Sequence, residues 1–201
     1  MTAVSAAKPT PAGGLFLFRH VSVESPQVPR SITESPVQIR VGSGHDTHRL
    51  VEGRPLILGG VRIEHGRGLL GHSDADVVLH AVTDALLGAA GLGDIGDAFP
   101  DTDPAWKDAD SRLFLRAALA RLNQAGWRLV NVDVIVFAQE PKLGPIKGRI
   151  RDSLAELLRL DRAAVNVKAK TGERVGAIGR AEAMSCQAVA LIDRPAGEPN
   201  P

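Results

Sequence analysis

The stretch that most constrains the fold of this chain is HSDADVVLHAVTDALLGAAGLGD, residues 72–94. Its spacing predicts a helix over 74–89, and alanine, valine and leucine occupy nearly every face of that helix. Such a helix is expected to be buried in the core. Asp76, His80 and Asp84, at steps of four, nevertheless form one polar stripe along it. Because burying carboxylates and an imidazole costs several kcal/mol unless they are paired, this stripe needs partners from elsewhere in the chain.

The start of this helix is predicted from a capping box, in which Ser73 is followed three residues later by Asp76. That box places His72 at the helix entrance, beside the positive end of the helix dipole, where anions bind. We interpret Asp76 and Asp84 as groups that orient histidine ligands of a metal ion. Ordinary hydrogen bonding along the helix is the alternative.

A partner for the polar stripe is offered by GHDTHRL, residues 44–50. Asp46 and His48 are two apart, and residues two apart on a strand point to the same side of it. With His80 they form an Asp/His/His set that suits zinc, with manganese or iron as alternatives. Three protein ligands leave one tetrahedral position open, as in catalytic zinc sites. A structural hydrogen-bonded pair is the competing interpretation, and spacing alone does not decide between them.

The remaining pattern predicts the other elements of one domain. Strands are predicted at 37–44, 55–63, 129–138, 164–170 and 182–192. Further helices are predicted over about 110–125 and about 146–159. Because strands and helices alternate without internal repeats, we expect an α+β fold, a two-layer sandwich with helices on one face of a sheet.

Length and charge limit the classes of function. The 201 residues, 44% of them hydrophobic, are enough for one domain with a core. A net charge of +1 gives no general reason to expect nucleic acid or an anionic membrane as partner. The single cysteine, Cys186, lies in an apolar run and is interpreted as a core residue in a reducing compartment. We therefore expect a soluble protein with a small-molecule partner, no nucleic acid and no membrane.

The two ends of the chain differ from its middle in composition. Residues 1–38 hold five of the 13 prolines and no sustained periodicity, so we expect a flexible extension. They contain only two acids, Glu24 and Glu34, which leaves a plastid-type transit peptide as an alternative to a bacterial cytoplasmic protein. Residues 194–201 are expected to form a frayed tail. The domain is therefore placed at 39–193.

Four motifs follow one another between Arg40 and about Ile192: RVGSGHDTHRL, LLGHSDADVVLHAVTDALLGAAGLGDIGDAFPDTDP, NVDVIVFAQEPKLGP and VNVKAKTGE. Together they resemble the 2-C-methyl-D-erythritol 2,4-cyclodiphosphate synthases, a family of the non-mevalonate route to isoprenoids. The resemblance implies ferredoxin-like subunits with a mixed sheet, assembled as a homotrimer with active sites at the subunit interfaces. It also implies a metal-dependent phosphorus–oxygen lyase. This activity cyclises 4-diphosphocytidyl-2-C-methyl-D-erythritol 2-phosphate to the 2,4-cyclodiphosphate and releases CMP.

The resemblance also assigns roles to residues of this chain. The implied zinc ligands are Asp46, His48 and His80. Glu173 matches the ligand of a second ion, magnesium or manganese, while His72 and Thr171 match residues that stabilise the transition state. The implied substrate-binding residues are Ser73, Asp94, Ile95, Gly96, Phe99, Asp101, Asp103, Ala138, Pro141, Lys142, Leu143, Gly144, Lys170 and Arg180. Within that set, residues 138–144 match the cytosine pocket.

Three positions depart from the family pattern: Lys170, Gly172 and Ala177. Lys170, where threonine is usual, can contact the diphosphate as a point charge or face solvent. Ala177 stands where an aromatic residue is frequent, which weakens the expectation of a ligand in the axial cavity of the trimer.

Two other functions fit the Asp/His/His set when it is considered alone. One is a zinc phosphohydrolase that uses the open position to activate water. The other is a trimeric binding protein in which the metal only ties subunits together. Thr171, Glu173 and the segment 138–144 favour the nucleotide-dependent synthase over both.

Overall fold

The computed structural model describes residues 36–196, and the expectations for residues 1–35 and 197–201 lie outside that range. The strands are β1 (Val37–Glu52), β2 (Leu56–Leu58), β3 (Val61–Ile63), β4 (Arg67–Leu70), β5 (Arg128–Phe137), β6 (Val165–Lys170) and β7 (Ala183–Pro195). The helices are α1 (Val77–Ala90), α2 (Ile95–Ala98), α3 (Arg112–Gln124), α4 (Lys147–Leu158) and α5 (Gly176–Gly179). Short 3-10 turns lie at Pro104–Trp106 and Arg162–Ala164.

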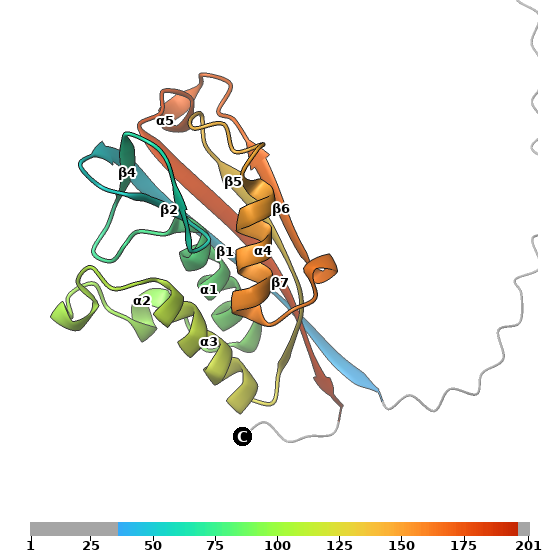
Figure 1. Ribbon diagram of the computed structural model, residues 1–201. Helices are drawn as coiled ribbons and strands as arrows, with labels where there is room; N and C mark the ends of the chain where they lie inside the picture. Colours follow the sequence, from blue (N-terminus) through green and yellow to red (C-terminus); the bar gives the residue numbers. More distant parts are fainter. Residues whose placement is uncertain (1–35, 197–201) are drawn as a thin grey trace, which may run out of the picture. The chain divides into compact units, whose positions relative to one another are not determined.

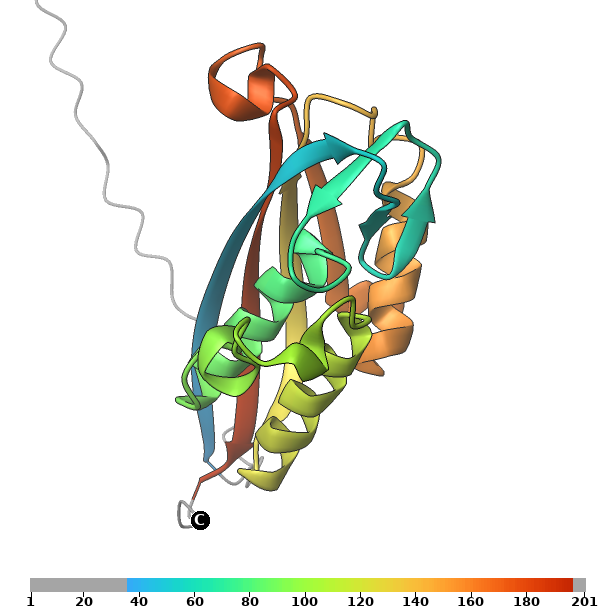
Figure 2. The ribbon, with the colours of Figure 1, turned by 90° about the vertical axis from the view of Figure 1, so that its left-hand side faces the viewer.

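A five-stranded sheet forms one layer, and α1, α3 and α4 form the other (Figures 1 and 2). The strand order is β4-β1-β7-β5-β6. β5 and β6 are parallel, whereas the other neighbouring strands are antiparallel. The predicted two-layer α+β sandwich with a mixed sheet is therefore confirmed.

The strands differ from their prediction in three places. β1 continues to Glu52, past the predicted end at residue 44. The segment 55–63 is not one strand but the hairpin β2–β3, which pairs as a separate small sheet. Gly59 and Gly60 form its turn with φ of 60° and 75°, the left-handed region that glycine enters without steric cost. β4 was not predicted, since a four-residue strand is too short to show a period in the sequence.

Helix α1 lies directly against β1 and β7 in the core, as its apolar pattern predicted (Figure 2). Two glycines of β1 allow this close approach. A Cβ atom on Gly44 would lie 2.0 Å from the carbonyl oxygen of Ala81, and one on Gly42 would lie 2.0 Å from that of Ala85. Cys186, on β7, is fully buried here, which confirms it as a core residue.

The start of α1 differs from the prediction, because the helix begins at Val77 instead of residue 74. Ala75 has a φ of 58°, a left-handed conformation that a helix cannot include. Asp76, and not Ser73, is the N-cap, and its carboxylate accepts hydrogen bonds from two backbone N–H groups of the first turn at 3.1 Å.

The ends of the described chain pair with each other. β1 begins at Val37 opposite Pro195, the last residue of β7, so the paired strands extend two residues beyond each predicted domain boundary. Arg40 and Arg194 lie over the ring of Trp127. The guanidinium carbon of Arg40 is 4.7 Å from the ring centroid, and that of Arg194 is 4.3 Å from it. No helix within residues 36–196 combines the length and apolar character that crossing a membrane requires.

Candidate metal centre and adjoining pocket

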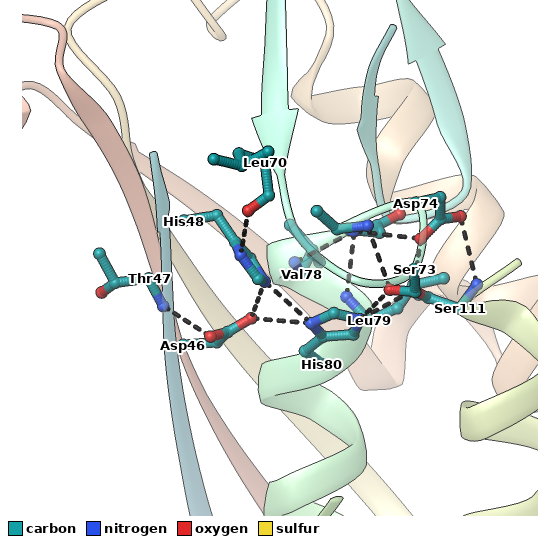
Figure 3. Close-up of polar contacts among 12 residues, drawn as sticks. Asp46, Thr47, His48, Leu70, Ser73, Asp74, Val78, Leu79, His80 and Ser111 are labelled. Carbon is teal, nitrogen blue, oxygen red and sulfur yellow. Dashed lines mark hydrogen bonds and ion pairs between the residues drawn. The ribbon is translucent and has the colours of Figure 1, made fainter. Parts of the chain in front are cut away.

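Three side chains converge where α1 crosses β1: Asp46, His48 and His80 (Figure 3). Oδ2 of Asp46 lies 2.9 Å from Nε2 of His48 and 2.9 Å from Nδ1 of His80, and the two nitrogens are 3.1 Å apart. The side chains are only 12–23% exposed. The fold therefore brings together the three residues predicted to bind a metal.

The outer nitrogen of each imidazole has a defined hydrogen-bond partner. Nδ1 of His48 lies 2.9 Å from the carbonyl oxygen of Leu70, which can only accept, so Nδ1 carries the proton. Nε2 of His80 lies 2.8 Å from Oγ of Ser111, whose own hydrogen is donated to Asp74, so Nε2 is the donor. In neutral rings, the two inner nitrogens therefore present lone pairs to each other and to a carboxylate.

Such an arrangement of lone pairs fits a divalent metal. Three acceptor atoms 2.9–3.1 Å apart repel one another unless a cation or a proton lies between them. Tetrahedral zinc with bonds of about 2.0–2.1 Å separates its ligand atoms by about 3.3 Å, close to these distances. One carboxylate and two imidazoles are also donors that zinc accepts.

The charges of this centre are coupled. Burial acts to raise the pKa of Asp46, but hydrogen bonds and charge from His48 and His80 outweigh it and hold that pKa well below its ordinary value. Burial acts to lower the pKa of His48, but the hydrogen bond and charge of Asp46 raise it above its ordinary value. Asp46 is thus ionised at neutral pH, which is the form that binds a metal.

The carboxylates of Asp76 and Asp84 accept their hydrogen bonds from backbone N–H groups and not from either imidazole, so their interpretation as ligand-orienting groups is wrong. The fully buried carboxylate of Asp76 accepts hydrogen bonds from the backbone of Gly59 at 2.8 Å and of Gly60 at 2.6 Å, in addition to capping α1. Asp84 accepts one from the backbone N–H of Ile95 at 2.8 Å, which holds α2 against α1. Both aspartates are hydrogen-bonded helix residues, as in the alternative interpretation, but their partners include backbone groups outside the helix.

A pocket of about 500 Å³ adjoins the centre. Its lining residues that the sequence predicted are His48, His72, Ser73, Ile95, Gly96, Phe99 and Asp101. The lining residues that were not predicted are Gly71, Pro100, Trp106 and Phe114. The centroid of the Phe99 ring lies 4.7 Å from that of the Phe114 ring and 5.3 Å from that of the Trp106 ring, and the Phe99 and Trp106 rings meet edge to face. One wall of the pocket is therefore aromatic, and it combines residues from separate elements that no single sequence pattern joins.

Two predicted site residues, Asp94 and Asp103, do not line this pocket but order the loops around it. Asp94 caps α2 by accepting from the backbone N–H of Asp97 at 2.8 Å. The Asp103 carboxylate accepts from the backbone of Ala105 at 2.9 Å, while its carbonyl accepts from Nε2 of His72 at 3.2 Å. This loop thus holds His72 at the pocket. The capping box had instead placed His72 at the entrance of a helix.

The other predicted site residues form a second group near the ends of β5 and β6. Its members are Ala138, Pro141, Lys142, Leu143, Gly144, Lys170, Thr171 and Glu173. The backbone N–H of Ala138 donates to the carbonyl of Lys170 at 2.9 Å, and Oγ1 of Thr171 donates to Oε1 of Glu173 at 2.5 Å. None of these residues lines the pocket beside the metal centre. Arg180, just past α5, forms an exposed ion pair with Glu182 at 2.7 Å.

The sheet separates the two groups within one chain. Asp46 pairs with Cys186 of β7, Cys186 with Val136 of β5, and Val136 with Ala169 of β6. Three strand spacings, about 14 Å, therefore lie between Asp46 and the strand that leads into Thr171.

The structure gives a reason for one departure from the family pattern. A Cβ atom on Gly172 would lie 2.4 Å from the backbone nitrogen of Gly179, so the loop and α5 touch at that point. Lys170 and Ala177 are both exposed, which leaves the Lys170 ammonium free to reach an anion.

Known proteins resemble this chain in sequence and in fold. The model of the YgbB family matches residues 39–193. The chain is 59% identical over 160 residues to the 2-C-methyl-D-erythritol 2,4-cyclodiphosphate synthase of Bordetella avium (strain 197N), covering 80% of this chain and 99% of that one. It is 61% identical over 153 residues to the synthase of the same name from Chromobacterium violaceum, covering 76% and 97%.

Solved structures agree with these matches. A 2C-methyl-D-erythritol-2,4-cyclodiphosphate synthase in its CDP-bound form superposes with a TM-score of 0.71 at 44% identity, covering 76% of this chain and 99% of that one. The bifunctional IspDF of Campylobacter jejuni superposes with a TM-score of 0.76 at 44% identity, covering 79% of this chain and 43% of that longer one. On sequence, fold and site together, the chain belongs to the YgbB family.

Proposed function

We propose that this chain is a 2-C-methyl-D-erythritol 2,4-cyclodiphosphate synthase. The observation that carries the proposal is the convergence of Asp46, His48 and His80 beside a pocket lined by His72 and Ser73, in a chain of this family. The substrate is 4-diphosphocytidyl-2-C-methyl-D-erythritol 2-phosphate. Its 2-phosphate attacks the β-phosphorus, a new phosphorus–oxygen bond closes the ring, and the bond to CMP breaks. No water is consumed.

The main obstacle to this reaction is repulsion between two anionic phosphates. Zinc held by Asp46, His48 and His80 would supply positive charge that offsets it and would orient the attacking phosphate. His72 and Ser73 line the pocket next to His48. The Ser73 hydroxyl can donate a hydrogen bond to a phosphate oxygen, and His72, whose Nε2 donates to the Asp103 carbonyl, can donate through Nδ1 when its ring is doubly protonated. No side chain has to act as general base, because a phosphate is already ionised near neutral pH.

The second group of residues has the chemistry to hold the leaving nucleotide. Glu173 offers a hard carboxylate ligand for magnesium or manganese, and Thr171 is bonded to it. Residues 138–144 would receive the cytosine, largely through backbone groups. The CDP bound in a solved structure that is 44% identical supports a cytidine nucleotide as the ligand.

We infer that a neighbouring chain completes each site in a homotrimer. Within one chain, Thr171 follows a strand that lies about 14 Å, or three strand spacings, from Asp46. A site that uses both groups on one small substrate therefore needs the second group from another copy.

The open face of the sheet supports this assembly. Ile39 and Val41 on β1 are each 64% exposed, and Val189 on β7 is 39% exposed. The helices α1, α3 and α4 all lie on the other face (Figure 2). Exposed apolar side chains on one face are typical of a subunit interface. Sedimentation should give a mass three times that of the 21.2 kDa chain, and a fully active monomer would contradict the trimer.

The two curated relatives described above are bacterial, which supports a cytoplasmic enzyme of the non-mevalonate pathway in a bacterium. The activity itself is tested by incubating the protein with the cytidyl substrate, zinc and magnesium and following phosphorus NMR. We expect equal amounts of CMP and the cyclic diphosphate. CMP with a linear bisphosphate would indicate a phosphohydrolase, and an unchanged but bound substrate would indicate a binding protein.

A further inference from the structure

We propose that Ser111 and Asp74 are positioning residues that fix which nitrogen of His80 faces the metal. The inference rests on the metal centre proposed above. It concerns two residues that are not metal ligands and that the sequence pattern did not mark as part of a site. The segment around Ser111, DADSR at 108–112, has a sequence pattern typical of the start of a helix.

The three residues form a short chain of hydrogen bonds (Figure 3). Nε2 of His80 lies 2.8 Å from Oγ of Ser111, and Ser111 donates its hydroxyl hydrogen to Oδ1 of Asp74. The backbone N–H of Ser111 donates to Oδ2 of the same carboxylate at 3.2 Å. Because the only hydroxyl hydrogen is used on Asp74, Oγ of Ser111 can only accept from His80.

Ser111 occupies a position where a serine hydroxyl ordinarily caps a helix. It is the N-cap residue of α3, and an N-cap serine usually accepts a hydrogen bond from a backbone N–H of the first turn, worth about 1 kcal/mol. Here the side chain makes no capping hydrogen bond. The residue is fully buried, so its hydroxyl faces only His80, Asp74 and Ser73. The Ser111 hydroxyl therefore contacts the imidazole of His80 instead of capping α3.

The consequence concerns the proton on His80. Oδ2 of Asp46 lies 2.9 Å from Nδ1 and would attract the ring proton to that nitrogen. A proton on Nδ1 would occupy the lone pair that a metal needs. The Ser111–Asp74 pair offers the nearer acceptor at Nε2, at 2.8 Å against 3.2 Å for Oγ of Ser73, so the proton stays there and Nδ1 remains free.

The same hydrogen bonds also tie the loop before α1 to the start of α3, so a purely structural role must be separated from this one. We would compare Ser111→Ala with Ser111→Thr, which keeps the hydroxyl. Ser153→Ala is the matched control, because it removes a different partly buried hydroxyl, one that donates to the carbonyl of Gly59 at 2.6 Å. Asp74→Asn serves as the second variant if Ser111→Ala does not fold.

Two quantities are measured on each variant: zinc affinity by chelator competition, and the His80 tautomer in metal-free protein by nitrogen-15 NMR of the ring. We expect Ser111→Ala and Asp74→Asn to bind zinc about 10- to 100-fold more weakly, with the ring proton moved to Nδ1. Ser111→Thr and Ser153→Ala should match the parent protein in both measurements.

The inference is overturned if Ser111→Ala keeps both the parent affinity and the proton on Nε2. It is also overturned if Ser111→Thr is as weak as Ser111→Ala, since packing rather than the hydroxyl would then be responsible. Failure of the parent protein itself to bind zinc would instead refute the metal centre. The tautomer measured without metal would still decide the role of Ser111 in that case.

Discussion

Nδ1 of His80 and Oδ2 of Asp46 meet at 2.9 Å across the interface between α1 and the sheet, although the two residues are 34 positions apart in the sequence. Their contact depends on how closely the helix lies on β1. That closeness depends in turn on Gly44, where any side chain would collide with the helix backbone. Packing and chemistry are therefore linked at this point of the fold.

The first prediction concerns metal content. The purified protein should carry about one zinc per chain, and His80→Ala should lose both the zinc and the activity, because one of three ligands is removed. His45→Ala is the matched control for zinc content alone, since His45 is exposed and lies on the opposite side of β1 from Asp46. Atomic absorption measures the zinc. Full occupancy in His80→Ala would rule out this ligand set.

The second prediction concerns Gly44. Gly44→Ala places a Cβ atom 2.0 Å from the carbonyl oxygen of Ala81, so either α1 moves or the fold is strained. We expect a loss of about 3 kcal/mol or more in the free energy of unfolding, together with weaker zinc binding. Gly148→Ala, where the new Cβ meets nothing within 4 Å, should leave both near the parent values. Urea unfolding provides the comparison, and an equally stable Gly44→Ala would show that the close approach is unimportant.

The third prediction separates the two metals. Glu173→Gln should keep its zinc, because Glu173 is not one of the three zinc ligands, and its carboxylate is a hard oxygen ligand suited to magnesium. Turnover should fall by about two orders of magnitude, the range seen when one charge-stabilising group is lost. Thr171→Ala should lower turnover less, since a hydroxyl contributes one hydrogen bond. CMP release over a magnesium titration measures both, and loss of zinc from Glu173→Gln would contradict the division of roles.

The fourth prediction is a pH dependence that arises from Asp76. Burial raises its pKa to about 6 from an ordinary value of 3.8, although backbone N–H groups of Gly60, Gly59 and Leu79 act in the opposite direction. Between these values the folded protein binds more protons than the unfolded chain. The contribution of Asp76 to stability is therefore fully present below pH 4 and is lost as the pH rises through about 6.

The size of this effect is about 3 kcal/mol. It is measured as the difference in unfolding free energy between the metal-free parent and Asp76→Asn, at fixed protein concentration, from pH 4 to 7. We expect the difference to shift against the parent as the pH rises. A shift in its favour would mean that the backbone hydrogen bonds to the carboxylate outweigh its burial.

The grouping of the three residues of the centre was predictable because its signals are local, whereas spacing alone did not decide that they bind a metal. Asp46 and His48 are two apart on a strand, and His80 lies on a helix whose apolar faces leave one polar stripe. The exact start of that helix was not predictable, since a capping-box spacing at Ser73 competes with the left-handed Ala75, which only the packed loop reveals. Hydrophobic periodicity shows which face of a helix or strand is buried, but it carries no information on the backbone conformation of such a loop.

The hydrogen bond of Ser111 shows the second limit. Ser111 lies 31 residues from His80, at a position where a serine is ordinarily explained as a helix cap. The aromatic wall of the pocket is similar, because Trp106 and Phe114 come from a 3-10 turn and a helix that meet only in the folded chain. Contacts of this kind depend on tertiary packing and leave no spacing in the sequence.

The most direct test of the account is an activity measurement on mixed oligomers of His80→Ala and Glu173→Gln chains. Each variant alone should be nearly inactive, because every site lacks either the metal centre or the second group. If each site combines the centre of one chain with Glu173 of its neighbour, random mixing in equal amounts should restore about one quarter of the parent rate of CMP release. Activity that stays at the level of the separate variants would contradict the shared site.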